Sequence, residues 1–180
     1  MATGSTILNS PFTESKDNMA TTYEKIATTT LGSNQQEITF SSITSAYTDL
    51  RIVLVAISST SVDFFRYRFN GDTGTNYSNT ELLGDGSSAL SQRNTDSSAI
   101  LIQNFGSSEP ALFEIDLFSY AGSTYKTTLN ATSRDRNGSG AVSRSVGLWR
   151  NTAAITSITL RANTNFASGT TATLYGILKA

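Results

Sequence analysis

The chain contains neither cysteine nor histidine, and these two absences close several routes to chemistry. Without cysteine there is no disulfide, no thiolate nucleophile and no thiolate metal site. Without histidine the chain lacks the commonest general base and the commonest metal ligand of proteins. The composition therefore disfavours an enzyme, and we predict a non-enzymatic protein with no catalytic residues, no metal site and no cofactor.

Charge is also scarce, since charged residues make up 15% of the 180 residues and the formal net charge is −1. The basic residues are scattered rather than gathered into a stripe, which argues against a nucleic-acid partner. The longest apolar run, Ile52 to Ile57, is too short to span a bilayer. The first twenty residues lack a basic segment followed by an apolar one, so we expect no signal peptide, no membrane partner and synthesis in a cytoplasm.

Serine and threonine take the place of the charges, with 27 Thr and 26 Ser residues. Abundant β-branched Thr favours pleated strands over helices. In the segment Ala111 to Tyr120, for example, Phe113, Ile115 and Leu117 share one face, which is typical of a strand with one buried side. The almost continuously apolar segment Leu50 to Ile57 predicts a central strand that is buried on both faces.

Turns rich in Gly, Asn and Asp separate the predicted strands, as at Asn70-Gly71-Asp72 between two of them. Nine or ten short strands are expected, among them segments 77–83 and 99–105. This pattern predicts an all-β protein with a single-domain antiparallel β-sandwich, arranged as a jelly roll with two sheets of four or five strands. We assign the sandwich to residues 21–180 and an extended N-terminal arm to residues 1–20.

The arm has a polar sequence with one small apolar patch, formed by Ile7, Leu8 and Phe12. An arm of this kind has no core of its own and can bind a neighbouring sheet. We therefore predict that these three residues bind a protein partner.

Aromatic residues offer a second kind of candidate site. Trp149 is the only Trp in the chain, and together with Tyr77 it would suit stacking against a sugar ring. Aromatic residues of a sandwich more often anchor the core or an interface. Both interpretations of Trp149 and Tyr77 remain open at this point.

Carboxylates suggest two further sites, each with a simpler alternative. Asp72 and Asp85 lie in Gly-rich turns and would suit Ca²⁺, but Asp is also an ordinary turn residue and the spacing matches no complete calcium loop. Glu114 and Asp116 form an acidic pair of the kind found in glycosidases. Because they are two residues apart on one strand, we interpret them as part of a solvated outer face.

Several segments, taken in chain order, resemble a family of tailed-bacteriophage virion proteins. The resemblance extends over about residues 21–178 and therefore covers nearly all of the chain except the arm. The segments that carry it are Tyr23-Glu24-Lys25-Ile26-Ala27, Leu31-Gly32, Ile38-Thr39-Phe40-Ser41-Ser42-Ile43, Tyr47-Thr48-Asp49-Leu50, Arg68-Phe69-Asn70-Gly71-Asp72, Asn76-Tyr77-Ser78, Leu83-Gly84-Asp85-Gly86-Ser87-Ser88, Asn165-Phe166-Ala167-Ser168-Gly169-Thr170 and Leu174-Tyr175-Gly176-Ile177.

The resemblance implies a component of the virion, with two alternative positions. One is a decoration (cement) protein on the capsid exterior, which would be a homotrimer that binds the major capsid protein and copies of itself. The other is a tail-fibre or receptor-binding module, for which a host-surface glycan would be the ligand. The short chain and the N-terminal arm favour the decoration protein.

Overall fold

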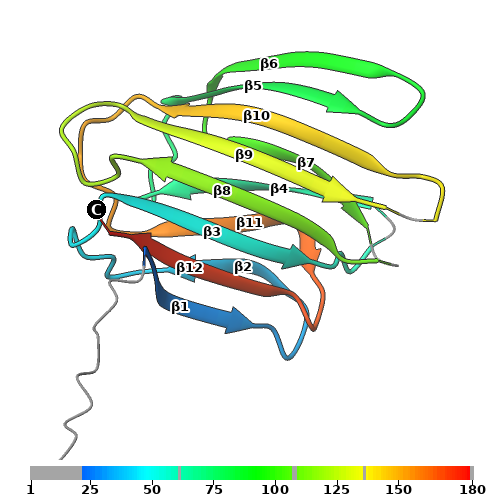
Figure 1. The fold of residues 1–180 in the computed structure, drawn as a ribbon, viewed down its shortest axis with the longest axis horizontal. Coiled ribbons are helices and arrows are strands. Elements are labelled where there is room, and N and C mark those ends of the chain that lie inside the picture. Colours follow the sequence, from blue (N-terminus) through cyan, green and yellow to red (C-terminus); the bar gives the residue numbers. More distant parts are fainter. Residues whose placement is uncertain (1–21, 61, 107–108, 136, 179–180) are drawn as a thin grey trace, which may run out of the picture.

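The computed structural model describes residues 22–60, 62–106, 109–135 and 137–178, which form strands and turns but no helix (Figure 1). The all-β prediction is therefore confirmed for this part of the chain. Its twelve strands are β1 (Tyr23–Thr30), β2 (Gln35–Phe40), β3 (Asp49–Ala56), β4 (Val62–Phe69), β5 (Tyr77–Gly84), β6 (Ala89–Ser97), β7 (Ile100–Gly106), β8 (Ala111–Phe118), β9 (Lys126–Arg134), β10 (Ala141–Trp149), β11 (Ile158–Phe166) and β12 (Thr171–Ile177).

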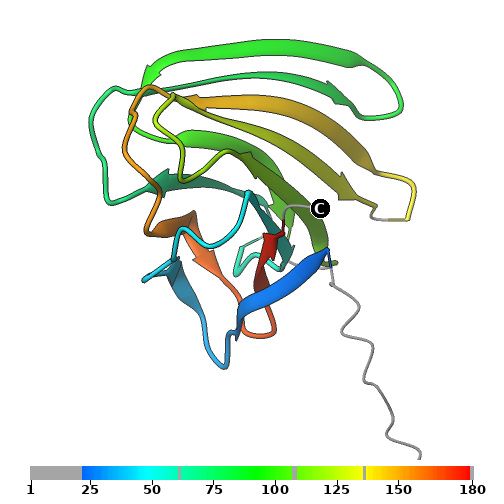
Figure 2. The same ribbon diagram turned by 60° about the vertical axis from the view of Figure 1, so that its left-hand side comes forward.

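The strands form two antiparallel sheets that pack face to face as a β-sandwich. The larger sheet has the strand order β1-β12-β3-β8-β9-β10-β5-β6, and the smaller has the order β2-β11-β4-β7. Figure 1 looks onto the larger sheet, with β6 at the top and β1 at the bottom, and Figure 2 shows this sheet curving over the smaller one. The predicted sandwich is confirmed, but the prediction of two sheets of four or five strands is wrong.

The connections between the sheets are those of a jelly roll. Each strand of the smaller sheet lies, in chain order, between two strands of the larger sheet, so the chain repeatedly crosses from one layer to the other. If β5, β6, β9 and β10 are set aside, two layers of four hydrogen-bonded strands remain, with the orders β1-β12-β3-β8 and β2-β11-β4-β7. The jelly-roll prediction therefore holds in an enlarged form, because the additional strands widen only one sheet.

The edge strand β6 shows why the expected number of strands was too low. It occupies Ala89–Ser97, between the two segments that the sequence indicates as strands, and it pairs with β5 alone. Most of its residues are polar on both faces, and Leu90 is half exposed. A strand that buries no face lacks the alternation by which strands are recognised in a sequence.

The central strand β3 differs from its prediction in one respect. Leu50, Ile52 and Leu54 are fully buried against the smaller sheet, as expected. On the opposite side, however, Val53 is only partly buried and Val55 is exposed. The prediction that both faces are buried is wrong, because among the described residues no second layer covers this side of the larger sheet.

Aromatic rings fill the centre of the sandwich. The ring of Phe65 on β4 meets that of Phe113 on β8 edge to face, with centroids 4.8 Å apart. Phe105 and Phe166 stack beside them with centroids 5.6 Å apart. Edge-to-face and offset-stacked pairs of this kind are the favoured aromatic arrangements, so this cluster locks the two sheets together.

Candidate docking surface

The outer face of the larger sheet, meaning the side chains that point away from the smaller sheet, carries aliphatic residues at positions open to solvent. An uncovered face of an antiparallel sheet is normally polar. The exposed aliphatic side chains on this face are Leu82 (64% exposed), Val142 (60%), Val146 (45%), Leu112 (40%) and Val55 (38%). A group of exposed apolar residues on neighbouring strands is typical of a surface that binds another macromolecule.

Strand β10 shows the most direct departure from ordinary strand patterning. Its outward residues Val142 and Val146 are apolar and exposed, whereas its inward residues Ser143 and Ser145 are polar and almost fully buried. The usual rule would place the valines inside and the serines outside. Packing within the chain therefore does not account for the two valines.

The inward side of β10 favours small residues because the layers approach closely there. A Cβ atom added to Gly147 would lie 2.5 Å from Thr128 Oγ1 and 2.7 Å from Ile100 Cδ1. Both distances are shorter than real Cβ contacts. The serines and the glycine thus meet a steric requirement of the core, while the outward valines remain available to a partner.

The register of β8, β9 and β10 aligns their outward side chains in rows across the sheet. Residues that face each other in an antiparallel pair point to the same side, with Cβ atoms roughly 5 Å apart. Three such rows are Leu112–Ser133–Val142, Glu114–Ala131–Arg144 and Asp116–Leu129–Val146. Five of these nine side chains are aliphatic, and in the middle row the small Ala131 separates an acidic residue, Glu114, from a basic one, Arg144. The outer face therefore combines apolar side chains with one charge of each sign in the same row.

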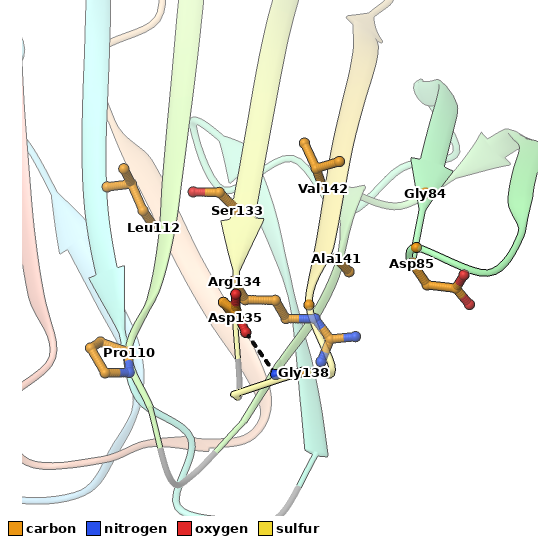
Figure 3. A pocket seen from close by; sticks show the side chains of 12 residues that line it. Gly84, Asp85, Pro110, Leu112, Ser133, Arg134, Asp135, Gly138, Ala141 and Val142 are labelled. Carbon is orange, nitrogen blue, oxygen red and sulfur yellow. Dashed lines mark hydrogen bonds between the residues drawn. The ribbon is translucent and has the colours of Figure 1, made fainter.

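A groove of ≈ 640 Å³ crosses the ends of β8, β9, β10 and β5 on this face. Figure 3 shows Leu112, Ser133, Val142 and Gly84 side by side along it, with Arg134 below Ser133. A second groove of ≈ 480 Å³ shares Val142 and Gly84 and continues toward β6. A Cβ atom added to Gly84 would meet nothing within 4 Å, so the hollow is open to an incoming side chain.

The few charges on the outer face are arranged unevenly. Arg51 binds Asp116 through two hydrogen bonds of 2.5 and 2.8 Å, and its guanidinium lies 5.5 Å from the centre of the Tyr23 ring. The hydrogen bond to Asp116 is the main reason why the pKa of Arg51 is raised. Glu114 and Arg144, by contrast, form no salt bridge with any residue in the described part of the chain, although the charge of Glu114 also acts on Arg51.

Trp149 and Tyr77 are core residues, so of the two interpretations that the sequence leaves open the burial supports the core and not ligand stacking. Trp149 is 1% exposed and Tyr77 is fully buried. Their rings stack on each other with centroids 6.2 Å apart, and the Phe69 ring packs against that of Trp149 at 5.4 Å. Because neither ring offers a face to solvent, a sugar has nothing to stack on at this position.

Asp72 is a structural turn residue that holds Trp149 in place. Its carboxylate accepts hydrogen bonds from Trp149 Nε1 at 2.7 Å, Asn76 Nδ2 at 3.0 Å and the backbone N–H of Gly74 at 2.8 Å. Partial burial acts to raise the pKa of this carboxyl, but the three hydrogen bonds together outweigh it and the pKa is lowered. The turn interpretation of Asp72 thus accounts for its contacts without a calcium ion.

The lowered pKa of Asp72 predicts a loss of stability in acid. The folded protein binds this proton less readily than the unfolded chain, so the contribution is complete above a pH of about 4 and disappears as the pH falls through the folded pKa. We expect Asp72→Asn to cost about 1–2 kcal/mol at neutral pH and to flatten the acid dependence. Urea unfolding from neutral to low pH, followed by Trp149 fluorescence, measures both effects.

Asp135→Asn is the matched control for Asp72→Asn, because the exposed Asp135 carboxylate accepts, among the described residues, only a long hydrogen bond of 3.4 Å from the backbone N–H of Gly138. This control should retain the acid dependence of the parent protein. An unchanged slope in Asp72→Asn would show that the hydrogen bonds of the turn do not govern this titration.

Asp85 has the same structural role in the turn between β5 and β6. Its carboxylate accepts hydrogen bonds from the backbone N–H groups of Ser87 at 2.9 Å and Ser88 at 2.7 Å, and from both hydroxyls. The backbone bonds lower the pKa of this exposed carboxyl most strongly. The turn interpretation of Asp85 thus accounts for its contacts in the same way as that of Asp72.

Two buried carboxylates inside the sandwich were not indicated by the sequence. Glu81 and Asp63 are each 2% exposed. Glu81 accepts a hydrogen bond from Gln92 Nε2 at 2.8 Å, and Asp63 accepts one from the backbone N–H of Thr164 at 2.9 Å. Buried carboxylates need such partners. Alternation marks positions 63 and 81 as inward-facing, but it cannot say that an acidic side chain there will find a donor.

The remaining candidate residues, Ile7, Leu8 and Phe12, lie outside the described residues. Within the described ranges, no group of three or more His, Cys, Asp or Glu side chains is placed to hold a metal ion. No helix in this part of the chain is long and apolar enough to cross a membrane. Comparison of the chain with known protein families, with curated proteins and with solved structures gives no match.

Proposed function

We propose that this chain is a non-enzymatic structural protein of a bacteriophage virion, which decorates the capsid and stabilises the head through contacts between subunits. The observation that carries the proposal is the outer face of the larger sheet, where Val142, Val146 and Leu82 are exposed over inward residues that are polar or small. A surface of this kind gains stability when a partner covers it.

The composition supports the same proposal. A net charge of −1 gives no long-range field to speed encounters, so association depends on shape and on many weak contacts. Such contacts become strong when a symmetric particle repeats them. The resemblance to tailed-phage virion proteins adds the identity of the particle and of the partner, the major capsid protein.

The alternative of a glycan-binding tail module has less support than the decoration protein. Its two candidate stacking residues, Trp149 and Tyr77, lie in the core. No other observation on the described residues favours a sugar over a protein as the partner.

Co-sedimentation with purified capsids that lack this protein tests the proposal. We expect the parent protein to sediment with capsids, and the variant Leu82→Asp/Val142→Asp to bind at least about tenfold more weakly, because two carboxylates would then have to be desolvated in the contact. Tyr125→Asp is the control. Tyr125 is an exposed hydrophobic residue like Leu82 and Val142, but it lies in the β8–β9 connection.

The arm is tested in the same assay. Replacing Ile7, Leu8 and Phe12 with Ser, or deleting residues 1–20, should weaken capsid binding, whereas replacing Thr3, Thr6 and Ser10 with Ala should not. If the parent protein failed to sediment with capsids under any condition, the decoration role would be rejected.

A further inference from the structure

The outer face has a symmetry of its own about strand β9. On one side of β9 lies β8 with Leu112 and Glu114 pointing outward, and on the other side lies β10 with Val142 and Arg144 in the same rows. Neighbouring strands are about 4.8 Å apart, so Glu114 and Arg144 stand at nearly equal distances on either side of the central Ala131.

We infer that two copies of this chain pack outer face to outer face, about a two-fold axis that runs along β9. A half-turn about this axis exchanges the β8 side with the β10 side and leaves each residue in its own row. Leu112 of one copy then faces Val142 of the other, and Glu114 faces Arg144 of the other. A two-fold contact of this kind uses one self-complementary surface on both copies.

Charge complementarity selects this arrangement. Glu114 and Arg144 form no salt bridge within the described part of the chain, and the two-fold pairing gives each a partner of opposite sign, twice in every dimer. The third charged residue in these rows, Asp116, is already paired with Arg51. No charge of the three rows is therefore left facing a like charge across the contact.

The other in-plane axis, which runs across the strands, gives the opposite result. A half-turn about an axis between the second and third rows would place Glu114 of one copy against Asp116 of the other. An axis through the second row itself would place Glu114 against Glu114. Like charges juxtaposed in an interface cost several kcal/mol, so the axis along β9, which brings opposite charges together, is favoured over both of these.

The shape of the sheet fits a contact centred on β9. Because the larger sheet curves over the smaller one, two such sheets meet along their middle strands rather than at their edges (Figure 2). The axis passes over the small residues Ala131 and Ser133, which lets the sheets approach to the usual packing distance of about 10 Å. Leu112 of each copy then packs against Val142 of the other on either side of the axis, over the hollow that these residues border (Figure 3).

The inference names a second copy of this chain as the occupant, and it rests on the proposed function only in treating the outer face as a contact surface. Because the capsid is proposed to bind the same face, the second copy and the capsid compete for it, and the dimer is the form that exists without capsids. It predicts a two-fold pair in solution, without capsids. This differs from the homotrimer implied by the resemblance, because a single self-complementary face closes a dimer and a ring of three needs two different surfaces.

Charge reversal on the full chain tests the pairing, with sedimentation equilibrium over a wide range of protein concentrations as the measurement. Glu114→Arg alone and Arg144→Glu alone should each weaken dimerisation at least about tenfold, because each creates two like-charge contacts per dimer. The double variant Glu114→Arg/Arg144→Glu should restore the parent affinity, because it re-forms both pairs with the signs exchanged.

Lys25→Glu is the matched control for Arg144→Glu. Lys25 is exposed on the edge strand β1, four strands from β9, where the rotated copy has no strand to face it. This variant should dimerise like the parent protein. Circular dichroism and thermal melting of every variant separate a loss of pairing from a loss of folding.

Cross-linking gives an independent measurement, because the chain has no cysteine of its own. A single cysteine introduced by Ala131→Cys lies next to the axis, so a short bismaleimide should join two copies with high yield. Thr173→Cys on β12 is the control, since the axis places its two copies about six strand spacings, or about 29 Å, apart.

Three results would overturn the inference: a parent protein that stays monomeric at every concentration, a trimer that is indifferent to the charge reversals, or a double variant that fails to recover. Capsid co-sedimentation remains a separate measurement. A monomeric protein whose capsid binding is lost in Glu114→Arg would reject the dimer and support the decoration role. An intact dimer that never binds capsids would support the dimer and reject the decoration role.

Discussion

Replacing Trp149 with alanine is expected to lower the free energy of unfolding by about 3–5 kcal/mol, which is the usual cost of removing a large buried aromatic side chain. Trp149 is 1% exposed, and its ring lies against those of Tyr77 and Phe69. The substitution removes these contacts and leaves a cavity between the sheets. The fold should survive but melt at a much lower temperature.

The hydrogen bond from Trp149 to Asp72 adds to this cost. In Trp149→Ala the Asp72 carboxylate loses the indole donor at 2.7 Å, while Asn76 and Gly74 still donate to it. Trp149→Phe keeps most of the ring and removes the donor, so it should cost less than the alanine variant. The difference between the two variants separates ring packing from the hydrogen bond.

Urea unfolding followed by circular dichroism measures both variants, because this signal does not depend on the Trp itself. Tyr125→Ala is the matched control, since Tyr125 is an aromatic residue that is 56% exposed, and it should stay within about 0.5 kcal/mol of the parent protein. A Trp149→Ala protein as stable as the parent would contradict the buried position of this ring. A loss of glycan binding without a loss of stability would contradict it as well.

The strands were largely predictable because their signal is local. In β8 the alternation of Phe113, Ile115 and Leu117 with polar residues predicts both the strand and its buried side, and the burial agrees. The turn at Asn70-Gly71 is equally local, since both residues adopt positive φ, at 51° and 67°. Backbone preference and side-chain period are contained in a few adjacent residues.

The sizes of the sheets were not predictable in this way. Strand β6 lies at an edge and buries neither face, and β10 joins its chain neighbour β9 to β5, which lies far away in the chain. Which strands neighbour each other depends on long-range closure of the chain, which no short segment encodes.

The docking surface was hidden from sequence reasoning for a related reason. The pattern of β10 shows alternation, but it does not say which side is the core, and the ordinary rule would bury Val142 and Val146. Gly147 lies so close to Ile100 and Thr128 that the inward side of β10 favours small residues, and the valines therefore point outward. Trp149 is a second case, because only the packing of the two sheets distinguishes a core ring from one that could bind a ligand.

A second large effect is expected at Gly176 on β12. Gly176 is paired with Glu24 on one side and Leu50 on the other, and the ring of Tyr47 lies directly over it. A Cβ atom at this position would lie 2.3 Å from both Cγ and Cδ1 of Tyr47. Gly176→Ala should therefore cost about 3 kcal/mol of folding free energy, at the upper end of the range for overpacking.

The Tyr47 ring cannot simply swing away, because the segment that carries it is held in place. The backbone N–H of Tyr47 donates to the Tyr120 hydroxyl at 3.3 Å, and that hydroxyl donates to the Thr44 carbonyl at 2.5 Å. Tyr120 is fully buried, so its two hydrogen bonds hold the segment between β2 and β3 against the core. The clash at Gly176 must then be relieved by movement of the strand or of this whole segment.

Two comparisons decide whether the clash is the cause. Gly84→Ala makes the same chemical change in a strand where the new Cβ meets nothing within 4 Å, and it should be neutral or stabilise by up to about 1 kcal/mol. Tyr47→Ala in the Gly176→Ala background removes the ring and should recover part of the loss, so the two substitutions will be non-additive. Equal costs for Gly176→Ala and Gly84→Ala, or strict additivity with Tyr47→Ala, would mean that the ring does not close over this strand as the structure shows.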